Sequence, residues 1–193
     1  MSNEHVKNLE LTVLSDNWYT LRKATYELLG RDGKWQPQQR EAYDRGNGAV
    51  ILLYNKAEGK VILTRQFRLP TYLNGNADGY MIEACAGLLD KDNPDDCIRK
   101  ETEEETGYKI TEVQKVFEAY MSPGSVTEIL YFFVAEYNKS QKVGDGGGLE
   151  EETEHIEVLE LPFGRALDMV KTGEIKDAKT IMLLQYAQLN DLV

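Results

Sequence analysis

Residues 93–108 read Asn-Pro-Asp-Asp-Cys-Ile-Arg-Lys-Glu-Thr-Glu-Glu-Glu-Thr-Gly-Tyr, and this stretch decides the fold. Its two ends are typical of a helix, because Asn93 is a favourable N-cap, Pro94 fits a first helical turn, and Gly107 commonly ends a helix. We therefore predict a helix between Asn93 and Gly107. The register of its side chains can then be read along the chain.

Three glutamates of this helix, Glu101, Glu104 and Glu105, are spaced i, i+3 and i+4, so their carboxylates share one face within about one turn. Like charges at this spacing repel one another by roughly 0.2–0.5 kcal/mol per pair. A divalent cation relieves that repulsion, since magnesium takes carboxylate oxygens and shares substrate phosphates. A solvated acidic face explains the spacing equally well. The ion pairs expected in that case are Arg99 to Glu103 and Lys100 to Glu104.

The composition is that of a globular protein, with 41% hydrophobic and 28% charged residues in a chain of 193. No apolar run approaches the ~20 residues needed to cross a bilayer. The first residues, Met-Ser-Asn-Glu-His-Val-Lys, lack the pattern of a secretory signal, so we expect a cytoplasmic protein. The two cysteines, Cys85 and Cys97, lie in no CxxC or Cys/His cluster, and we expect both to be small buried residues and not parts of a disulfide or zinc site.

The net charge of -11 disfavours a broad electrostatic surface for nucleic acid or for anionic membranes. We therefore expect neither as a partner. The charge does not exclude an anionic substrate, because a few local arginines and lysines can hold phosphates, and carboxylates can bind cations that bridge to those phosphates.

Hydrophobic patterns predict strands before and after the acidic helix. The expected strands cover residues 18–29, 34–45, 49–54, 60–67, 112–121, 128–137 and 155–161. From Pro162 onward, apolar residues recur at helical spacing and predict two amphipathic helices. Strands bracketed by helices indicate a mixed α/β layer fold. Between the last two strands, the glycine-rich residues 144–148 lead into an acidic run, which predicts a mobile loop.

Residues 1–45 are expected to form a β-hairpin arm in front of a domain that covers residues 46–193. An isolated hairpin buries too little surface to be stable. The arm therefore packs either against a second subunit or against its own chain, and the sequence leaves both arrangements open.

The acidic helix and the strand before it resemble the Nudix box, which joins a glycine, a loop, a glutamate and the block Arg-Glu-apolar-x-Glu-Glu-x-Gly-apolar. The block here reads Lys100-Glu-Thr-Glu-Glu-Glu-Thr-Gly-Tyr108, and the entry to it reads Glu83-Ala-Cys-Ala-Gly-Leu-Leu-Asp90. Three departures are a lysine for the usual arginine, Thr102 for an apolar residue, and a loop that is one residue short.

The whole chain resembles the GDP-mannose pyrophosphatase branch of the Nudix superfamily, which tolerates the short loop and the lysine. Pro123 is also similar to a proline that the nucleoside diphosphate sugar subgroup has after its box. The segments that carry the resemblance are Ser15-Asp-Asn, Tyr43-Asp-Arg-Gly-Asn-Gly, Arg65-Gln-Phe-Arg, Cys97-Ile-Arg-Lys-Glu, Met121-Ser-Pro-Gly and Thr172-Gly-Glu-Ile.

The resemblance implies a Nudix-type α/β/α sandwich with a mixed sheet, preceded by the N-terminal β-hairpin arm. It implies magnesium-dependent hydrolysis, with manganese as an alternative metal, of the pyrophosphate bond in a nucleoside diphosphate sugar. For GDP-mannose the products are GMP and mannose 1-phosphate. Two alternatives stay open: a pyrophosphatase for ADP-ribose or another such sugar, and a catalytically silent Nudix-like module that binds a nucleotide. The intact glutamates argue against the silent module.

The resemblance also implies roles for single residues. The metal ligands are the carbonyl of Ala86 with Glu101, Glu105 and Glu152, while Glu104 assists and Glu128 is the expected base. Glu151 and Glu154 are alternatives to Glu152, which is also a catalytic candidate. The expected substrate contacts are Trp18, Arg40, Glu41, Arg68, Ala86, Gly87, Glu105, Glu128 and Lys179. Because Trp18 and Arg40 lie on the arm, the resemblance implies a homodimer with shared active sites. Without it, an aromatic core residue and surface ion pairs explain the same residues.

Overall fold

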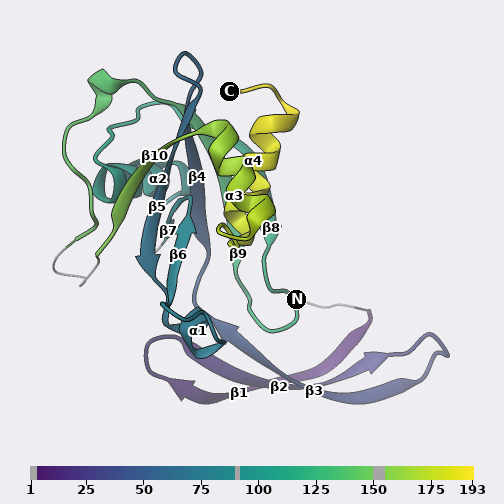
Figure 1. Ribbon diagram of the computed structural model, residues 1–193. Helices are drawn as coiled ribbons and strands as arrows, with labels where there is room; N and C mark the ends of the chain where they lie inside the picture. Colours follow the sequence, from purple (N-terminus) through teal and green to yellow (C-terminus); the bar gives the residue numbers. More distant parts are fainter. Residues whose placement is uncertain (1–3, 90–91, 150–154) are drawn as a thin grey trace. The chain divides into compact units, whose positions relative to one another are not determined.

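The computed structural model describes residues 4–89, 92–149 and 155–193 of the chain (Figure 1). The chain divides into two compact units. The first unit comprises Met1–Asn47 and Tyr120–Ile129, and the second comprises Gly48–Ala119 and Leu130–Val193.

The described part of the first unit contains a sheet of three strands, β1 (Val6–Asp16), β2 (Thr20–Leu29) and β3 (Trp35–Asp44), in the order β1-β2-β3. Both pairs are antiparallel, so β2 and β3 form the predicted hairpin. The strand β1 was not predicted. Its regular alternation is interrupted by two register shifts, between Lys7 and Glu10 and between Val13 and Ser15.

The second unit is built on a mixed sheet, in which the described residues supply seven strands. The strands run in the order β10-β5-β4-β9-β8, with β6 paired to β5 and β7 paired to β4. The β4–β9 pair is parallel, whereas β4 pairs antiparallel with β5 and β7. The strands are β4 (Gly48–Asn55), β5 (Lys60–Phe67), β6 (Tyr80–Glu83), β7 (Cys85–Leu88), β8 (Gln114–Tyr120), β9 (Ile129–Glu136) and β10 (Glu157–Pro162). The strands predicted from hydrophobic patterns are confirmed, with ends shifted by up to two residues.

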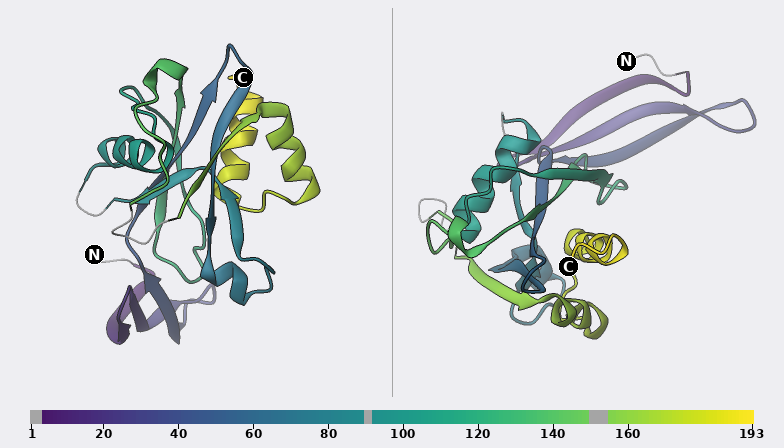
Figure 2. Two further views of the ribbon diagram at one scale, coloured as in Figure 1. Left: turned by 60° about the vertical axis from the view of Figure 1, so that its left-hand side comes forward. Right: turned by 90° about the horizontal axis from the view of Figure 1, so that it is seen from above.

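Helices cover both faces of this sheet (Figure 2). On one face α2 (Pro94–Thr106) packs Cys97 and Ile98 against Ile51 of β4. Neighbouring side chains of a strand point to opposite faces, so Leu52 points toward the other face, where α4 (Ala178–Leu189) contacts β4. There α3 (Phe163–Thr172) contacts β10. The predicted α/β/α sandwich is confirmed.

Shorter elements connect these layers. The helix α1 (Leu69–Leu73) follows β5, and the 3-10 turn η1 (Lys139–Gln141) follows β9. Both cysteines are buried, as predicted. Over the residues that the structure describes, no helix is long and apolar enough to cross a membrane.

Candidate active site

The acidic helix α2 begins and ends where the sequence predicts. The amide of Asp96 donates to Asn93 Oδ1 at 3.0 Å, and Gly107 ends the helix with a φ of 75°. One of the expected surface ion pairs forms, with Lys100 Nζ 3.6 Å from Glu104 Oε1. The other was predicted wrongly: Arg99 binds the carboxylate of Asp96 in the first turn, and Glu103 pairs with Lys109.

Glu101 and Glu105, the two predicted metal ligands on α2, lie against the backbone of β7. The amide of Ala86 donates to Glu105 Oε2 at 3.3 Å, and Glu105 is buried. The carboxylate of Glu101 lies so close to Gly87 that a Cβ atom there would be 2.1 Å from Glu101 Cδ. Glu101 and Glu105 therefore border two adjacent residues of one strand.

The buried thiol beside these carboxylates responds to their charge. Burial of Cys85 is the largest effect that raises its pKa, followed by the charge of Glu105, a hydrogen bond to Glu105, and the charge of Glu101. The thiol therefore stays neutral at physiological pH. The negative charge of this part of the site belongs to Glu101 and Glu105.

This donor set fits a hard divalent cation. Two carboxylates beside the backbone of Ala86 are oxygen ligands of the kind that magnesium and manganese bind. Within residues 4–89, 92–149 and 155–193, no three His, Cys, Asp or Glu side chains gather closely enough to hold a metal ion. The predicted late ligand Glu152 and its alternatives Glu151 and Glu154 lie outside the described residues.

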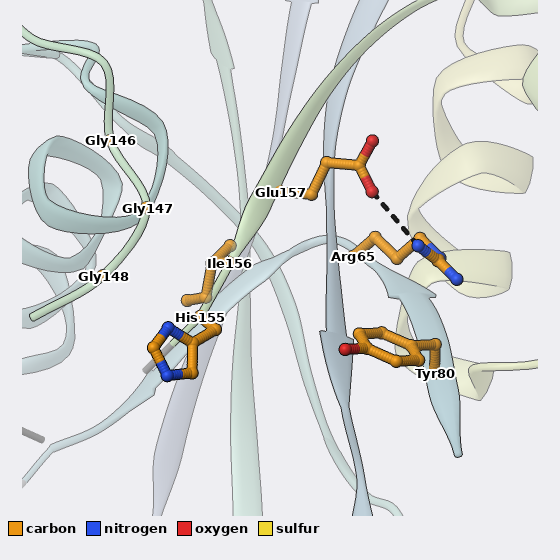
Figure 3. A pocket seen from close by; sticks show the side chains of 8 residues that line it. All are labelled: Arg65, Tyr80, Gly146, Gly147, Gly148, His155, Ile156 and Glu157. Carbon is orange, nitrogen blue, oxygen red and sulfur yellow. Dashed lines mark hydrogen bonds and ion pairs between the residues drawn. The ribbon is translucent and has the colours of Figure 1, made fainter. Parts of the chain in front are cut away.

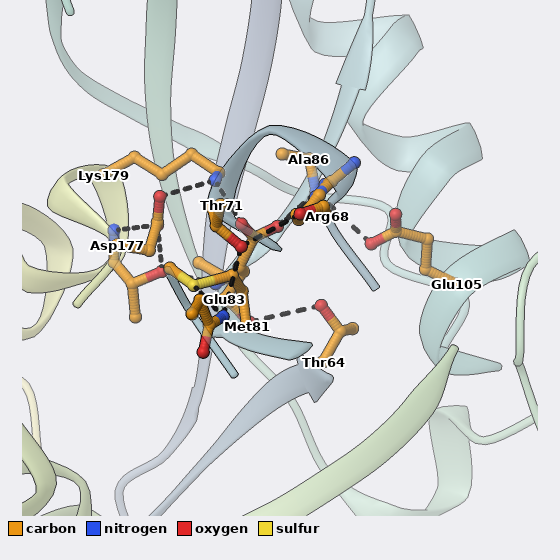
Figure 4. Close-up of polar contacts among 12 residues, drawn as sticks. Thr64, Arg68, Thr71, Met81, Glu83, Ala86, Glu105, Asp177 and Lys179 are labelled. Atoms are coloured by element: carbon orange, nitrogen blue, oxygen red, sulfur yellow. Dashed lines mark hydrogen bonds and ion pairs between the residues drawn. The ribbon is translucent and has the colours of Figure 1, made fainter. Parts of the chain in front are cut away.

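Two predicted substrate residues, Arg68 and Lys179, converge on one buried carboxylate, that of Glu83 (Figure 4). Arg68 donates from Nε at 3.0 Å and from Nη2 at 2.7 Å to Glu83 Oε2. Lys179 Nζ lies 3.4 Å from Glu83 Oε1 and 2.8 Å from Asp177 Oδ1. The Glu83 side chain is only 5% exposed. The carboxylate that joins these ion pairs is therefore buried, whereas 39% of the Arg68 side chain is exposed.

Electrostatics join this group to the acidic helix. Burial by itself would raise the pKa of Glu83, but Lys179 and Arg68 outweigh burial and hold that pKa below its ordinary value. Burial would also lower the pKa of Arg68, whereas Glu83, and after it Glu105, raise it. Glu83 is thus a carboxylate at neutral pH, and Arg68 lies within the field of both Glu83 and Glu105.

Glu83 and Asp177 are parts of the site that were not predicted from the sequence. Asp177 caps α4, because its Oδ2 accepts from the amide of Thr180 at 2.9 Å and from Thr180 Oγ1 at 2.6 Å. Thr180 Oγ1 in turn accepts from the amide of Ala84 at 2.7 Å. The signals available were an aspartate three residues before a threonine at a helix start, and a glutamate at the head of the strand that enters the Nudix box.

In the first unit, the predicted base Glu128 has a cationic partner. Arg45 Nε lies 3.4 Å from Glu128 Oε1, and the Glu128 side chain is 11% exposed. The next amide, of Ile129, donates to Asn47 Oδ1 at 3.0 Å, and Thr127 N donates to the carbonyl of Tyr43 at 3.1 Å. The chain before β9 is therefore fixed to the end of β3. Sequence reasoning did not single out Arg45.

The other predicted contacts of the first unit lie on its sheet. Trp18 is 84% exposed, so the alternative that it is an aromatic core residue is wrong within this chain. Arg40 and Glu41 lie on β3, where Glu41 is opposite Lys23 of β2. Arg40 Nη1 donates to the carbonyl of Gln39 at 2.6 Å.

The first part of the predicted mobile loop is held at the end of α2. Gly147 N donates to the carbonyl of Glu105 at 2.9 Å, and Gly148 N donates to that of Glu104 at 3.1 Å. These bonds satisfy carbonyls that a helix leaves without partners at its C-terminus. Within the glycine run, Gly146 is needed because the backbones approach closely there: a Cβ on Gly146 would lie 2.4 Å from the carbonyl oxygen of Glu105.

Beside this glycine run lies an open pocket of about 530 Å³ (Figure 3). Its described lining residues are Arg65, Tyr80, Gly146, Gly147, Gly148, His155, Ile156 and Glu157. Arg65 lies 3.2 Å from Glu157 and 3.5 Å from Asp78, and its guanidinium lies over the ring of Tyr80. The charge of Arg65 is thus already matched, and none of the predicted site residues is among these lining residues.

Comparison with known proteins agrees with the geometry. The family model described as the NUDIX domain matches residues 44–184. The chain belongs to the Nudix family. Its class is that of a Nudix pyrophosphohydrolase, as predicted. A second model, described as the GDP-mannose pyrophosphatase NudK N-terminal domain, matches residues 5–43.

Relatives of this Nudix protein align over almost its whole length. The GDP-mannose pyrophosphatase of Yersinia enterocolitica is 57% identical over 188 residues, which are 97% of each chain. That of Yersinia pestis strain Pestoides F is 59% identical over 96% of this chain and 92% of its own. That of Salmonella typhimurium is 59% identical over 94% of each chain. The predicted resemblance is confirmed.

Proposed function

We propose that this Nudix protein hydrolyses the pyrophosphate bond of GDP-mannose and releases GMP and mannose 1-phosphate. The observation that carries the proposal is the pair of glutamates, Glu101 and Glu105, at the backbone of Ala86 and Gly87. Relatives of nearly equal length that are named GDP-mannose pyrophosphatases support the choice of sugar and base.

Magnesium, with manganese as the alternative, would be held by the carbonyl of Ala86, Glu101, Glu105 and Glu152. When bound, such an ion polarises phosphoryl oxygens and lowers the pKa of a water molecule. Glu104, paired with Lys100 on the same helix, assists by keeping further negative charge at this face. Substitution of each residue by glutamine tests Glu152 against its two alternatives, Glu151 and Glu154.

The side chains of the protein bind and orient the substrate. Arg68 and Lys179 donate hydrogen bonds to the oxygens of the diphosphate, for which the planar guanidinium is well suited. Glu128 accepts the proton of the attacking water, and the ion pair with Arg45 fixes its carboxylate. Gly87 leaves room for the Glu101 carboxylate.

The arm, residues 1–45, is proposed to pair with a second copy of the chain, and residues 46–193 are proposed to form the catalytic domain. The sheet of the arm carries large apolar side chains that are exposed in one chain, with Leu9, Leu11 and Val13 each more than half exposed. Exposed apolar surface of this extent is typical of an interaction site. In the dimer, Trp18, Arg40 and Glu41 of the arm contact the substrate of a shared site. Thiols that form no disulfide fit a reducing compartment, and we propose the cytoplasm.

The decisive experiment measures product release from GDP-mannose, GDP-glucose, ADP-ribose and a dinucleoside polyphosphate, each with magnesium, with manganese and with EDTA. We expect metal-dependent turnover with the highest kcat/KM for GDP-mannose. A preference for ADP-ribose would mean that ADP-ribose is the substrate and that the protein hydrolyses its pyrophosphate bond by the same chemistry. Nucleotide binding without turnover of any substrate would favour the silent module.

The metal assignment has its own test. Removing a direct ligand in Glu101→Gln or Glu105→Gln should cost more than the roughly 10- to 100-fold in activity that is typical of outer-shell partners. Glu103→Gln is the matched control, because Glu103 lies on the same helix but pairs with Lys109. Equal activity of all three variants would refute the assignment.

A further inference from the structure

Glu83 is a buried carboxylate that the proposed chemistry does not use. Only 5% of its side chain is exposed, and both of its oxygens face cations, Oε2 toward Arg68 and Oε1 toward Lys179. Lys179 also binds Asp177, so two cations and two carboxylates balance one another. A balanced and hydrogen-bonded group of this kind can remain ordered away from water, whereas an unpaired member could not.

The bonding within this group leaves part of Arg68 for a ligand. Both of its bonds to Glu83 come from one edge of the guanidinium, from Nε and Nη2. The hydrogen bonds that join its side chain to other described residues do not involve Nη1, and 39% of the side chain is exposed. The Nε and Nη2 edge of the guanidinium thus binds Glu83, and Nη1 is placed to donate to a ligand. The negative charge of Glu105 also acts on this guanidinium.

We propose that Glu83 is a positioning residue, which orients Arg68 and Lys179 toward the diphosphate of the substrate. This inference rests on the proposed function, because it needs a diphosphate at that site. Long cationic side chains lose much rotational freedom when they bind an anion. A carboxylate that fixes both of them in advance removes that cost before the substrate arrives. Asp177 supports the same arrangement by fixing Lys179 from the start of α4.

The test is Glu83→Gln, which keeps the size of the side chain and removes its charge. We expect a rise of about tenfold or more in the KM for GDP-mannose and in the inhibition constant of GDP, with a smaller change in kcat. The matched control is Glu160→Gln, because Glu160 also pairs with a lysine, Lys60 at 2.8 Å, but on β10. The control should leave both constants within about threefold of the wild-type values.

A double-mutant cycle separates positioning from a general structural effect. If Glu83 acts through Arg68, then Glu83→Gln should raise KM much less in an Arg68→Ala background than in the wild type. The same rise in both backgrounds would overturn the proposal, and so would an unchanged KM in Glu83→Gln alone. If Glu83→Gln does not fold, Asp177→Asn gives the test through Lys179, since asparagine still caps α4.

Different results would refute the proposed function and the role of Glu83. Absence of GDP-mannose turnover in the wild-type protein would refute the proposed function. Normal turnover in the wild type, together with an unchanged KM and GDP inhibition constant in Glu83→Gln, would refute only the role of Glu83.

Discussion

Substitution of Gly87 by alanine should inactivate the enzyme while leaving its fold intact. The added Cβ would lie 2.1 Å from Glu101 Cδ and 2.2 Å from Glu101 Oε1, whereas ordinary contact begins at 3.4 Å. The carboxylate must therefore retreat by about 1 Å or more. Because the obstructing atoms belong to the end of a flexible side chain, Glu101 can retreat by rotation without a movement of the backbone.

The expected loss follows from the tolerance of the site. A catalytic group must lie within about 0.5 Å of its productive position, and a displacement of 1 Å can cost roughly 100-fold in rate. We therefore expect kcat/KM for GDP-mannose to fall about 100-fold or more, and the magnesium concentration for half-maximal rate to rise. The free energy of unfolding should fall by less than about 2 kcal/mol.

Steady-state kinetics over a magnesium titration, with urea denaturation of the same samples, would check both parts. Gly164→Ala is the matched control, because a Cβ at Gly164 in α3 meets nothing within 4 Å. The reasoning would be refuted by normal kinetics in Gly87→Ala, or by a loss of activity that follows entirely from unfolding.

Three further predictions concern the base, the end of α2 and the buried carboxylate. Glu128→Gln should lower kcat by about 100-fold or more and leave the GDP inhibition constant nearly unchanged; weaker GDP binding with normal kcat would mean that the base lies elsewhere. Gly107→Ala should lower the free energy of unfolding in urea by about 2–4 kcal/mol, since its φ is 75° and the added Cβ meets the backbone of Gly144. Gly33 has a φ of 76° with open space around it, so Gly33→Ala should lower that free energy by only about 1–2 kcal/mol. Equal losses in the two variants would contradict the close contact at Gly107. The pKa of Glu83 is held below its ordinary value of 4.5, so its ion pairs stabilise the fold fully above about pH 4.5 and progressively less as the pH falls through the lowered pKa. Urea denaturation from pH 7 to pH 3 should show the stability gap between wild type and Glu83→Gln closing below pH 4.5, and a constant gap would contradict this account.

Features that depend on neighbouring residues could be predicted from the order of the amino acids. The ends of α2 follow from Asn93, Pro94 and Gly107, because capping and termination act within one turn. The spacing of Glu101 and Glu105 on one face follows from helical geometry alone. The seven expected strands followed from patterns of a few residues each. These signals do not depend on the rest of the fold, and the structure confirms them.

Contacts between residues far apart in the sequence could be seen only in the folded chain. The bond between Ala84 and Thr180 joins positions 96 residues apart, and it places Asp177 and Lys179 beside Glu83. No local pattern encodes that meeting, because it depends on how α4 packs on the sheet. In the same way, the glycine run was predicted to be mobile, but its backbone amides reach the carbonyls of α2 only once the chain has returned to that helix. The spacing of Glu101 and Glu105 could thus be predicted from the sequence, whereas packing brings the carboxylates of Glu83 and Asp177 together with their cationic partners.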